Sequence, residues 1–322
     1  MTLPALFDRL RLPVIGSPLF LISGPELVIA QCKAGIVGSF PALNARPSAM
    51  LDEWLHRITE ELAAYNRANP DAPAAPFAVN QIVHRSNDRL EADLITCAKW
   101  QVPIVITSLG AREDLNAAVH GWGGITLHDV IDDTFARKAV AKGADGLIAV
   151  AAGAGGHAGR QSPFALIQEI RQWFDGPLAL SGSIASGGAI LAAQAMGADL
   201  AYIGSAFIAT DEANADAAYK QGIVDGRAKD IVYSSLFTGV HGNYLRGSIE
   251  AAGLDPDALP EGDYKTMNFG QSNGGEGSKA KAWRDIWGSG QGIGVIDAVE
   301  PVAARVARMQ AEYDAARARI GA

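Results

Sequence analysis

The chain has 322 residues, of which 48% are hydrophobic and 19% are charged, as in a soluble globular enzyme with a large core. Its formal net charge is -8 and no cluster of Lys and Arg stands out, so we do not expect nucleic acid as a partner. Two cysteines, Cys32 and Cys97, are too few for a disulfide framework, which favours a reducing compartment such as the cytoplasm.

The sequence has no evident secretory or membrane-spanning segment. Charged residues interrupt residues 1–12, which argues against the apolar region of a signal peptide. The longest apolar stretch, residues 190–209, is broken by Gln194, Asp199 and two glycines, so a helix, a turn and a strand explain it better than a membrane span. We therefore expect a cytoplasmic protein without a membrane partner.

Short apolar segments alternate with helix-like segments up to residue 210. Nearly continuous apolar character is typical of strands that helices cover on one face and a packed core on the other. Eight such segments predict an α/β fold in which a parallel sheet closes into a TIM (β/α)8 barrel. An open doubly wound sheet is the competing architecture, but Pro18 stands in the first strand–helix turn, where a dinucleotide-binding loop needs a backbone N–H. The predicted strands cover residues 13–16, 35–38, 77–80, 104–107, 124–127, 146–150, 178–181 and 200–204.

Several of the intervening helices have recognisable features. Pro25 and Glu26 suit the first turn of one predicted helix, and Ser162 precedes Pro163 as the N-cap of another. A third helix is indicated by apolar residues at helical spacing, whose aromatic members we interpret as packing rather than as cofactor contacts. These residues are Leu51, Trp54, Leu55, Ile58, Leu62 and Tyr65.

The pattern changes after residue 210, because residues 211–285 contain helix-like pieces and no clear series of strands. We interpret this region as a smaller, mainly helical substrate or lid domain inserted over the barrel mouth, with hinges in the glycine-rich residues 270–277. The predicted domains are the barrel at 1–210, this lobe at 211–285, and a C-terminal segment at 286–322 that packs back on the barrel.

A glycine-rich loop with a single histidine follows the predicted strand at 146–150. Residues 153–159 read Gly-Ala-Gly-Gly-His-Ala-Gly, which places His157 among glycines. Glycines at a strand end let the backbone approach a flat ligand closely and leave the imidazole beside that ligand. A glycine-rich loop with an incidental histidine is the alternative.

Two further loops predict an anion site. In barrels of this type, the loops after the seventh and eighth strands often bind a phosphate. Here those loops, residues 181–185 and 204–207, put small residues next to a helix start, where backbone N–H groups and the helix dipole favour an anion. Ser183 and Ser205 can add hydroxyl donors. Ordinary tight turns are the alternative.

Asn80 and Gln81 follow Phe77-Ala78-Val79 at the end of the third predicted strand, so two amide side chains are expected where this strand leaves the core. An amide both donates and accepts hydrogen bonds, which suits the mixed edge of an isoalloxazine ring or a phosphate-bearing chain. A turn or capping role for Asn80 is the alternative.

These motifs resemble the nitronate monooxygenase family, formerly called 2-nitropropane dioxygenases, and by extension the related flavin-dependent enoyl-acyl-carrier-protein reductases. The resemblance covers residues 12–210 and a shorter piece near the end, and its most specific element is the family's Ala-Gly-Gly-His-x-Gly motif at residues 154–159. The other matching segments are Ala78-Val79-Asn80, Gly182-Ser183-Ile184, Gly204-Ser205-Ala206-Phe207 and Trp287-Gly288-Ser289-Gly290-Gln291-Gly292.

The resemblance implies an FMN-binding barrel with His157 as the catalytic base. Three departures from the family pattern lie near the implied flavin: Leu19 replaces a methionine, Ser183 replaces a glycine, and His128-Asp129 stands where a lysine often follows the fifth strand. The implied cofactor contacts are Ser17, Pro18, Leu19, Asn80, Val150, Gly155, Gly156, Gly182, Ser183, Gly204 and Ser205.

The predicted reaction is the FMN-dependent oxidation of alkyl nitronates or nitroalkanes by O2 to a carbonyl compound and nitrite, in a monomer or homodimer. As a neutral imidazole with an ordinary pKa of ~6.5, His157 would remove the α-proton of a nitroalkane or donate a hydrogen bond to the nitronate oxygens. Two alternatives stay open. One is an FMN-dependent NAD(P)H reductase of a quinone or enoyl thioester, and the other is a non-catalytic barrel that binds a phosphorylated metabolite.

The positions of the other five histidines in the sequence indicate different roles. His84, after the third strand, and His241, in the lobe, are candidates to face the substrate, and His128 is a candidate to approach the flavin. His56 and His120 receive no chemical role. No set of His, Cys, Asp and Glu has the spacing of metal ligands, so we expect no metal.

Overall fold

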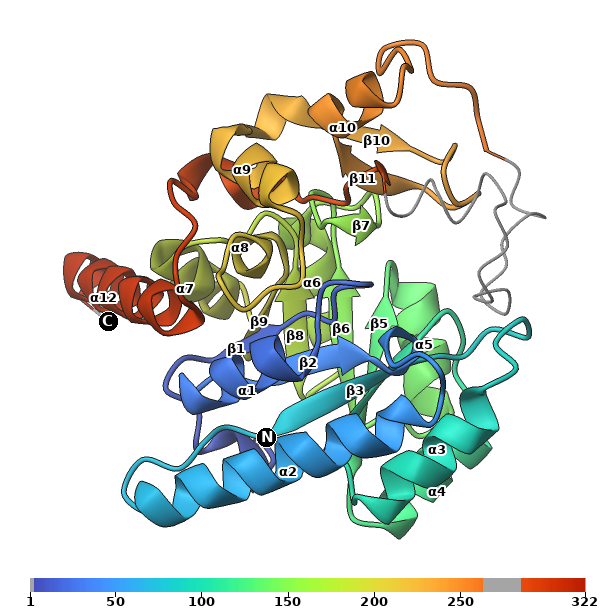
Figure 1. Cartoon of the computed structure of the whole chain (residues 1–322), viewed down its shortest axis with the longest axis vertical. Coiled ribbons are helices and arrows are strands. Elements are labelled where there is room, and N and C mark those ends of the chain that lie inside the picture. Colours follow the sequence, from blue (N-terminus) through green and yellow to red (C-terminus); the bar gives the residue numbers. More distant parts are fainter. Residues whose placement is uncertain (1–2, 263–284, 322) are drawn as a thin grey trace.

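Eight parallel strands alternate with helices around a barrel, and a smaller lobe lies at one end of it (Figure 1). A computed structural model describes residues 3–262 and 285–321 of the chain. The strands are β1 (Val14–Gly16), β2 (Gly38–Pro41), β3 (Phe77–Ile82), β4 (Ile104–Ser108), β5 (Ile125–Val130), β6 (Gly146–Val150), β8 (Leu178–Ser181) and β9 (Leu200–Ile203). Their hydrogen-bonded order, β1-β9-β8-β6-β5-β4-β3-β2, confirms the predicted parallel barrel.

The barrel closes between its first two strands. Gly16 N donates to Val37 O at 2.8 Å, and Val37 N donates to Val14 O at 3.0 Å. The predicted strand at 35–38 is shifted, because Gly35 turns the chain with a φ of +89° and pairing with β3 begins only at Gly38. The other seven strands overlap their predicted ranges.

Helices cover the outside of the barrel, and two of them begin where their capping residues predicted. Pro25 is the first residue of α1 (Pro25–Lys33) with Glu26 in its first turn, and Ser162 is the N-cap of α6 (Pro163–Arg171). Within the described ranges, none of the helices is long and apolar enough to cross a membrane. The other helices of the barrel are α2 (Met50–Ala68), α3 (Leu90–Lys99), α4 (Glu113–Gly121), α5 (Asp133–Ala141), α7 (Gly187–Ala195) and α8 (Ser205–Ile208).

The amphipathic helix predicted around residue 58 is confirmed as α2. Trp54 and Tyr65 are partly buried and pack against the same apolar cluster as the rest of its stripe. These two aromatic rings therefore contribute to packing, as the spacing indicated. The fully buried members of the stripe are Leu51, Leu55, Ile58 and Leu62.

The C-terminal helix α12 (Val302–Ile320) packs directly on α7 (Figure 1). A Cβ on Gly187, the first residue of α7, would lie 2.1 Å from Met309 O and 2.2 Å from Tyr313 N. A side chain at position 187 would therefore force the two helices apart. The domain boundaries at residues 210 and 285 stay a prediction.

The interior of the barrel is apolar along most of its length and becomes polar at the carboxyl ends of the strands. Side chains alternate along a strand, so Asn80 follows Ala78 on the inner face, two residues further toward the mouth. The same alternation brings Ser108, Asp129 and Tyr202 to the mouth. The buried apolar residues below them are Phe7, Ile15, Val37, Ala78, Ile104, Ile106, Leu127, Ile148, Ala179 and Leu200.

The lobe contains a small sheet that the sequence did not predict. Strands β10 (Ile231–Ser234) and β11 (Gly242–Leu245) are antiparallel, and β7 (Gly156–His157) adds from the barrel loop. The lobe, predicted to be mainly helical with no clear series of strands, therefore also contains a few short strands. The strands are two to four residues long and one belongs to a distant segment, so no local periodicity marks them. The predicted hinges at 270–277 lie outside the described residues.

Two helices complete the described part of the lobe, above the barrel in Figure 1: α9 (Ala217–Asp225) and α10 (Arg246–Ala251). The small core of the lobe is formed by buried Tyr244, Ile249 and Ile286. Short 3-10 helices occur at Ala5–Phe7, Ala42–Asn44, Ala228–Asp230 and Gln291–Val295.

Candidate active site

His157 lies at the junction of the barrel and the lobe. The chain leaves the barrel at the end of β6, and Gly156 and His157 then pair with Asn243 and Gly242 of β11. The His157 Nε2 atom lies 3.0 Å from the Thr238 Oγ1 atom, in the segment between β10 and β11. The lobe therefore orients the imidazole that the barrel loop carries.

Burial sets the protonation state of His157. Desolvation disfavours the charged imidazolium and lowers the pKa of His157 to about 4. The imidazole is therefore neutral at neutral pH, with one nitrogen protonated and the other carrying a lone pair. A neutral imidazole can accept a proton from a substrate.

The glycines of the loop permit close backbone contact with a segment far along the chain. A Cβ on Gly155 would lie 2.8 Å from Gly290 N, and a Cβ on Gly153 would lie 2.2 Å from the Ser183 Oγ atom. Asn243 Nδ2 donates to Ala154 O at 2.6 Å. The loop is thus held between the lobe, residues 289–290 and the loop after β8.

The two predicted phosphate loops follow the paired strands β8 and β9, and the loop after β9 contacts the first strand–helix turn. Ser17 N donates to Ile203 O at 2.8 Å, and a Cβ on Gly204 would lie 2.6 Å from the Ser17 Oγ atom. Gly290 N donates to the Ser205 Oγ atom at 2.9 Å. The structure therefore gathers residues from β1, β9 and the C-terminal segment at one side of the mouth.

The loop after β8 has an unusual backbone conformation. Gly182 has a φ of +139° and Ser183 has a φ of +57°, and Ser183 N donates to Gly153 O at 3.3 Å. A serine in the left-handed region is uncommon, and such positions cluster at binding sites. This loop, one of the two predicted phosphate loops, therefore contacts the glycine–histidine loop directly.

These residues fit a flavin phosphate by the chemistry of their donors. Ser17, Ser183 and Ser205 carry hydroxyl groups at adjoining strand ends, and the first amides of a helix have no carbonyl partner within that helix. At Gly153 and Gly204 a side chain would occupy the space between these loops.

The floor of the mouth is a hydrogen-bonded polar group. Asn80 Nδ2 donates to the Ser108 Oγ atom at 2.7 Å and to Ile106 O at 3.2 Å. Ser108 in turn bonds the Asp129 carboxyl group, while burial raises the pKa of Asp129 to about 6. Burial and the nearby Asp129 charge raise the pKa of Tyr202 well above its ordinary value.

Sequence reasoning identified Asn80 but missed Ser108, Asp129 and Tyr202. Each of them lies two residues after a buried apolar residue of the same strand, namely Ile106, Leu127 and Leu200. The period of two along these strands is the signal that could have found them. Val150 is placed in the same way, two residues after Ile148.

His128 and Gln81 do not face the mouth. The His128 Nδ1 atom lies 2.6 Å from the Thr107 Oγ1 atom in the layer between barrel and helices, and burial lowers the pKa of His128 to about 4. Gln81 Nε2 is 3.5 Å from the Cys97 Sγ atom of α3. The predictions that His128 approaches the flavin and that Gln81 joins Asn80 are wrong, because adjacent strand residues point to opposite faces.

The two histidines proposed to face the substrate lie in separate places. The His84 Nδ1 atom is 2.8 Å from the Ser86 Oγ atom in the loop after β3. The His241 Nε2 atom is 3.1 Å from an Arg160 nitrogen, and its ring stacks on Tyr233 with centroids 4.9 Å apart. His241 lines a cavity of about 210 Å³ within the lobe. That His84 and His241 contact the substrate stays a prediction.

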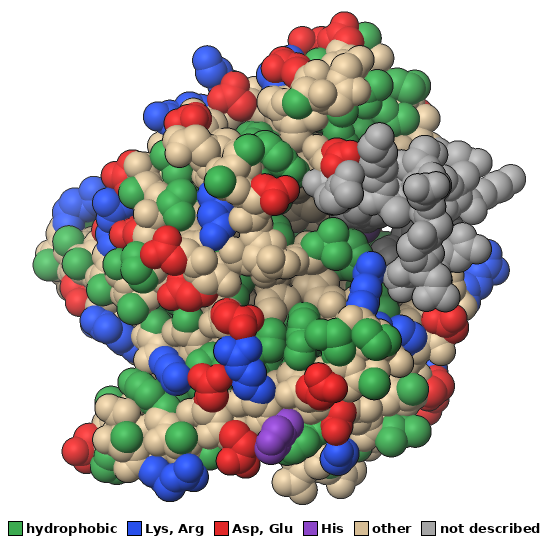
Figure 2. All heavy atoms as spheres, viewed as in Figure 1, with side chains coloured by type: hydrophobic (Ala, Val, Ile, Leu, Met, Phe, Trp, Pro, Cys, Tyr) green, Lys and Arg blue, Asp and Glu red, His purple; other side chains and the backbone are tan. Residues whose placement is uncertain are grey.

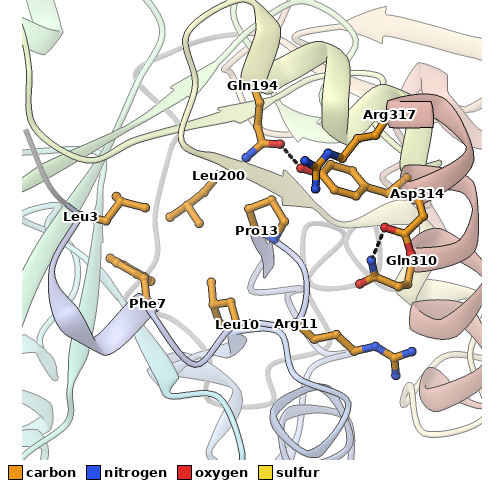
Figure 3. Close-up of a pocket in the computed structure, with 11 residues that line it drawn as sticks. Leu3, Phe7, Leu10, Arg11, Pro13, Gln194, Leu200, Gln310, Asp314 and Arg317 are labelled. Carbon is orange, nitrogen blue, oxygen red and sulfur yellow. Dashed lines mark hydrogen bonds between the residues drawn. The ribbon is translucent and has the colours of Figure 1, made fainter. Parts of the chain in front are cut away.

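A larger cavity, of about 300 Å³, lies at the opposite end of the barrel (Figure 3). Pro13 and Leu200, near the starts of β1 and β9, line it together with Phe7, Arg11 and Tyr313. Because the glycine–histidine loop follows the carboxyl ends of the strands, this cavity is remote from His157. It does not belong to the candidate active site.

Two further features, the distribution of surface charge and the grouping of possible metal ligands, do not mark an additional site among the described residues. Lys and Arg side chains are interspersed with Asp and Glu over the face shown in Figure 2. Among the described residues, no three His, Cys, Asp or Glu side chains are grouped so that they could hold a metal ion.

Known proteins resemble the whole chain. Residues 6–309 match the nitronate monooxygenase family. A nitronate monooxygenase of Paraburkholderia phytofirmans is 25% identical over 356 residues, covering 93% of this chain and 92% of that protein. The solved nitroalkane oxidase of Streptomyces ansochromogenes superposes with a TM-score of 0.80 at 25% identity, covering 98% of this chain and all 100% of that one.

A third relative has a different name. It is the (3aS,4S,5R,7aS)-5-hydroxy-7a-methyl-1-oxo-octahydro-1H-indene-4-carboxyl-CoA dehydrogenase of Rhodococcus jostii, 24% identical over 254 residues. The match covers 74% of this chain and 68% of that protein.

The barrel, its glycine–histidine loop and these similarities define a (β/α)8-barrel oxidoreductase. The family is also clear from the extent of the match. The chain belongs to the nitronate monooxygenase family, whose members are flavoproteins.

Proposed function

We propose that this protein binds FMN at the barrel mouth and oxidises alkyl nitronates, or the parent nitroalkanes, with O2 to a carbonyl compound and nitrite. The observation that supports this function best is the neutral His157 imidazole, which the lobe orients beside the loops that suit a flavin phosphate. The names of two similar proteins, a nitronate monooxygenase and a nitroalkane oxidase, agree with this chemistry.

The cofactor would be held mainly by backbone and small side chains. Ser183 and Ser205 would donate to its phosphate, with Gly182 and Gly204 leaving room for it. Asn80 and Val150 would lie under the flavin ring, and Ser17, Pro18 and Leu19 beside it, while Gly155 and Gly156 would allow the ring to approach the loop. When bound, FMN would supply the electron transfer between the nitronate and O2.

His157 would supply the proton transfer. It would take the α-proton of a neutral nitroalkane, and the electron pair of the broken C–H bond would remain in the nitronate. General-base assistance of this kind typically contributes on the order of 10²–10⁴ in rate. A nitronate supplied directly has already lost this proton, so its oxidation would need His157 less.

The test compares both substrates in the purified flavoprotein. We expect His157→Asn to lose turnover of neutral nitroethane by roughly 10²-fold or more while it keeps most of its turnover of ethylnitronate. His120→Asn is the matched control, because His120 pairs with Asp145 on the surface. Equal activity of His157→Asn and wild type on both substrates would contradict the base role. A colourless purified protein would contradict flavin binding.

A second candidate function keeps the flavin and changes the reaction to reduction of a quinone or enoyl thioester by NAD(P)H. The Rhodococcus jostii relative is named as a dehydrogenase of a carboxyl-CoA compound, which favours a thioester substrate. Anaerobic mixing with NADH or NADPH separates the two functions. Rapid bleaching of the flavin would support the reductase, and a stable yellow colour would support nitronate oxidation.

A further inference from the structure

Asp129 is a carboxyl group in the floor of the mouth that has no cation as its partner. It lies on the inner face of β5, two residues beyond the buried Leu127, and it is half-buried, so its exposed surface faces the mouth. Within the described part of the chain, no Lys, Arg or His side chain stabilises its charge. The charge of Asp129 is therefore not fixed by a neighbouring cation.

Two uncharged donors at the end of β4 hold the Asp129 carboxyl group. The Ser108 hydroxyl donates to it, and so does the backbone N–H of Leu109. The Ser108 proton is available for this bond, because Asn80 Nδ2 donates to the Ser108 Oγ atom at 2.7 Å. A carboxylate has about four acceptor positions, so these two donors leave part of its capacity for a partner in the mouth.

The backbone around Leu109 supports this contact. Leu109 has a φ of +61°, in the left-handed region that a bulky side chain rarely adopts. A Cβ on the next residue, Gly110, would lie 2.5 Å from Val83 O, so the loop after β3 packs closely on this turn. Such conformations persist where the surrounding structure holds them, and they cluster at functional sites. The turn thus fixes the direction of the Leu109 N–H.

Uncharged groups surround Asp129 on its other sides. The register of the sheet pairs it with Ile148 of β6, and Val150 lies further toward the mouth. Tyr202 of β9 also faces the mouth, and burial together with the Asp129 charge keeps its pKa well above the ordinary value. His128, the preceding residue of β5, points to the opposite face. Asp129 is therefore the group of the floor that can change its charge near neutral pH.

We propose that Asp129 is the charge-compensating group of the mouth, whose carboxylate binds one proton from solvent when electrons make the mouth more negative. A proton on its oxygen removes the repulsion between the carboxylate and the added charge. No substrate bond forms or breaks in this step. The electrons come from the substrate that is oxidised, and the proton returns to solvent when they leave to O2. This inference rests on the proposed flavin function and does not depend on His157.

The test is a redox titration of the flavin bound to the purified holoenzyme, with a chemical reductant and dye mediators, at a series of pH values. Because burial places the pKa of Asp129 at about 6, we expect the wild type to take up about one proton more per electron pair than Asp129→Asn just above that pH. The two midpoint potentials should agree below pH 6, and the wild-type potential should be the lower one above it. An identical pH dependence in both proteins would overturn the inference.

Infrared difference spectroscopy identifies the proton acceptor directly. On reduction above pH 6, the wild type should gain the carbonyl stretch of a protonated carboxyl group, which shifts in D2O, and Asp129→Asn should lack it. Asp132→Asn is the matched control, because Asp132 is the N-cap of α5 and asparagine caps a helix equally well. A wild type without this band, or a control that loses it, would contradict the assignment to Asp129.

Ser108→Ala makes the test graded. It removes one donor to the charged carboxylate, which raises the pKa of Asp129 further. The additional proton uptake should therefore begin at a higher pH than in the wild type. A structural role of Asp129 alone would not move this onset, so an unchanged onset would count against the inference.

The proposed function and the role of Asp129 fail separately, because the chemical reductant replaces the substrate. A yellow protein that takes up the additional proton but does not oxidise nitronates would refute the proposed reaction alone. Normal turnover of ethylnitronate, with the same proton uptake in the wild type and in Asp129→Asn, would refute the role of Asp129 alone.

Discussion

The barrel and the lobe contribute to the candidate site in different ways. The barrel supplies strand ends and glycine loops, and its strands from β2 to β6 pair with one another in chain order. The lobe sheet instead joins residues 156–157 to residues 231–245, and Leu245 N donates to Trp287 O at 2.8 Å. The strand-end loops proposed to hold the cofactor are therefore local in sequence, whereas the parts that orient His157 are not.

The two regions also differ in the size of their cores. The interior of the barrel is filled by a continuous set of buried apolar residues, whereas the cluster around Tyr244, Ile249 and Ile286 in the lobe is small. Other lobe residues, Tyr219, Ile223 and Leu245, are buried in a cluster that they share with the barrel. A small core resists local unfolding less than a large one, since fewer apolar groups are withdrawn from water. We therefore expect the part of the lobe around Tyr244 and Ile249 to open more readily than the barrel.

The largest expected effect comes from shortening one core residue in each region. Ile148→Ala removes a fully buried side chain from the barrel, and Ile249→Ala does the same in the lobe. Each should cost about 2–5 kcal/mol of local stability. Only Ile148→Ala should lower the global unfolding free energy measured in urea by that amount. Ile249→Ala should mainly speed hydrogen exchange in residues 231–252. Equal loss of global stability in both variants would show one cooperative unit.

The pH dependence of stability tests the buried histidine of the barrel wall. The pKa of His128 is about 4 in the folded protein against an ordinary 6.5, so between these values the unfolded chain binds a proton that the folded chain does not. Stability contributed by neutral His128 is therefore present above pH 6.5 and lost as the pH falls toward 4. The expected loss is roughly 3 kcal/mol.

The measurement is urea unfolding of the wild type and of His128→Asn near pH 4 and above pH 6.5. The unfolding free energy of His128→Asn should fall less on acidification than that of the wild type. Asp129 acts in the opposite direction, because its folded pKa is raised to about 6, so the folded chain retains a proton that the unfolded chain releases. Identical acid sensitivity of wild type and His128→Asn would show that His128 does not titrate in this way.

A smaller effect is expected at the contact between the glycine–histidine loop of the barrel and residues 289–290 of the C-terminal segment. Gly155→Ala places a Cβ 2.8 Å from Gly290 N, so the two backbones must separate. We expect a loss of about 1–3 kcal/mol in stability, together with weaker retention of flavin. Gly121→Ala is the matched control, since a Cβ there meets nothing within 4 Å. Flavin absorbance after gel filtration measures retention, and unchanged retention in Gly155→Ala would contradict this description of the junction.

The smallest effect concerns the contact between α9 and the C-terminal segment. Tyr219 stacks on Trp287 with ring centroids 4.9 Å apart and planes 6° from parallel. Its hydroxyl also donates to Gly288 O at 2.5 Å. Tyr219→Phe removes only the hydroxyl, whereas Tyr219→Leu also removes the stack. We expect Tyr219→Leu to be less stable than Tyr219→Phe by about 0.5–1.5 kcal/mol in thermal or urea unfolding. Equal stability of the two variants would exclude a contribution from stacking.

Local sequence patterns were sufficient for the barrel and for the position of the loops that are proposed to bind a phosphate. Apolar runs marked the strands, Pro25 and Ser162 marked helix starts, and small residues after β8 and β9 marked the loops that the structure brings together. These features depend on backbone geometry and on burial of neighbouring residues, which act over a few positions of the chain. A local pattern can therefore specify them.

Tertiary structure alone decided how His157 is oriented and which residues form the floor of the mouth. Thr238, Asn243 and Gly290 meet the glycine–histidine loop from far along the chain. Hydrogen bonds and backbone contacts between distant segments leave no periodicity in the sequence. At residues 128 and 129 the choice of face depended on the register of β5 in the closed barrel. Packing turned Asp129 toward the mouth and His128 away from it.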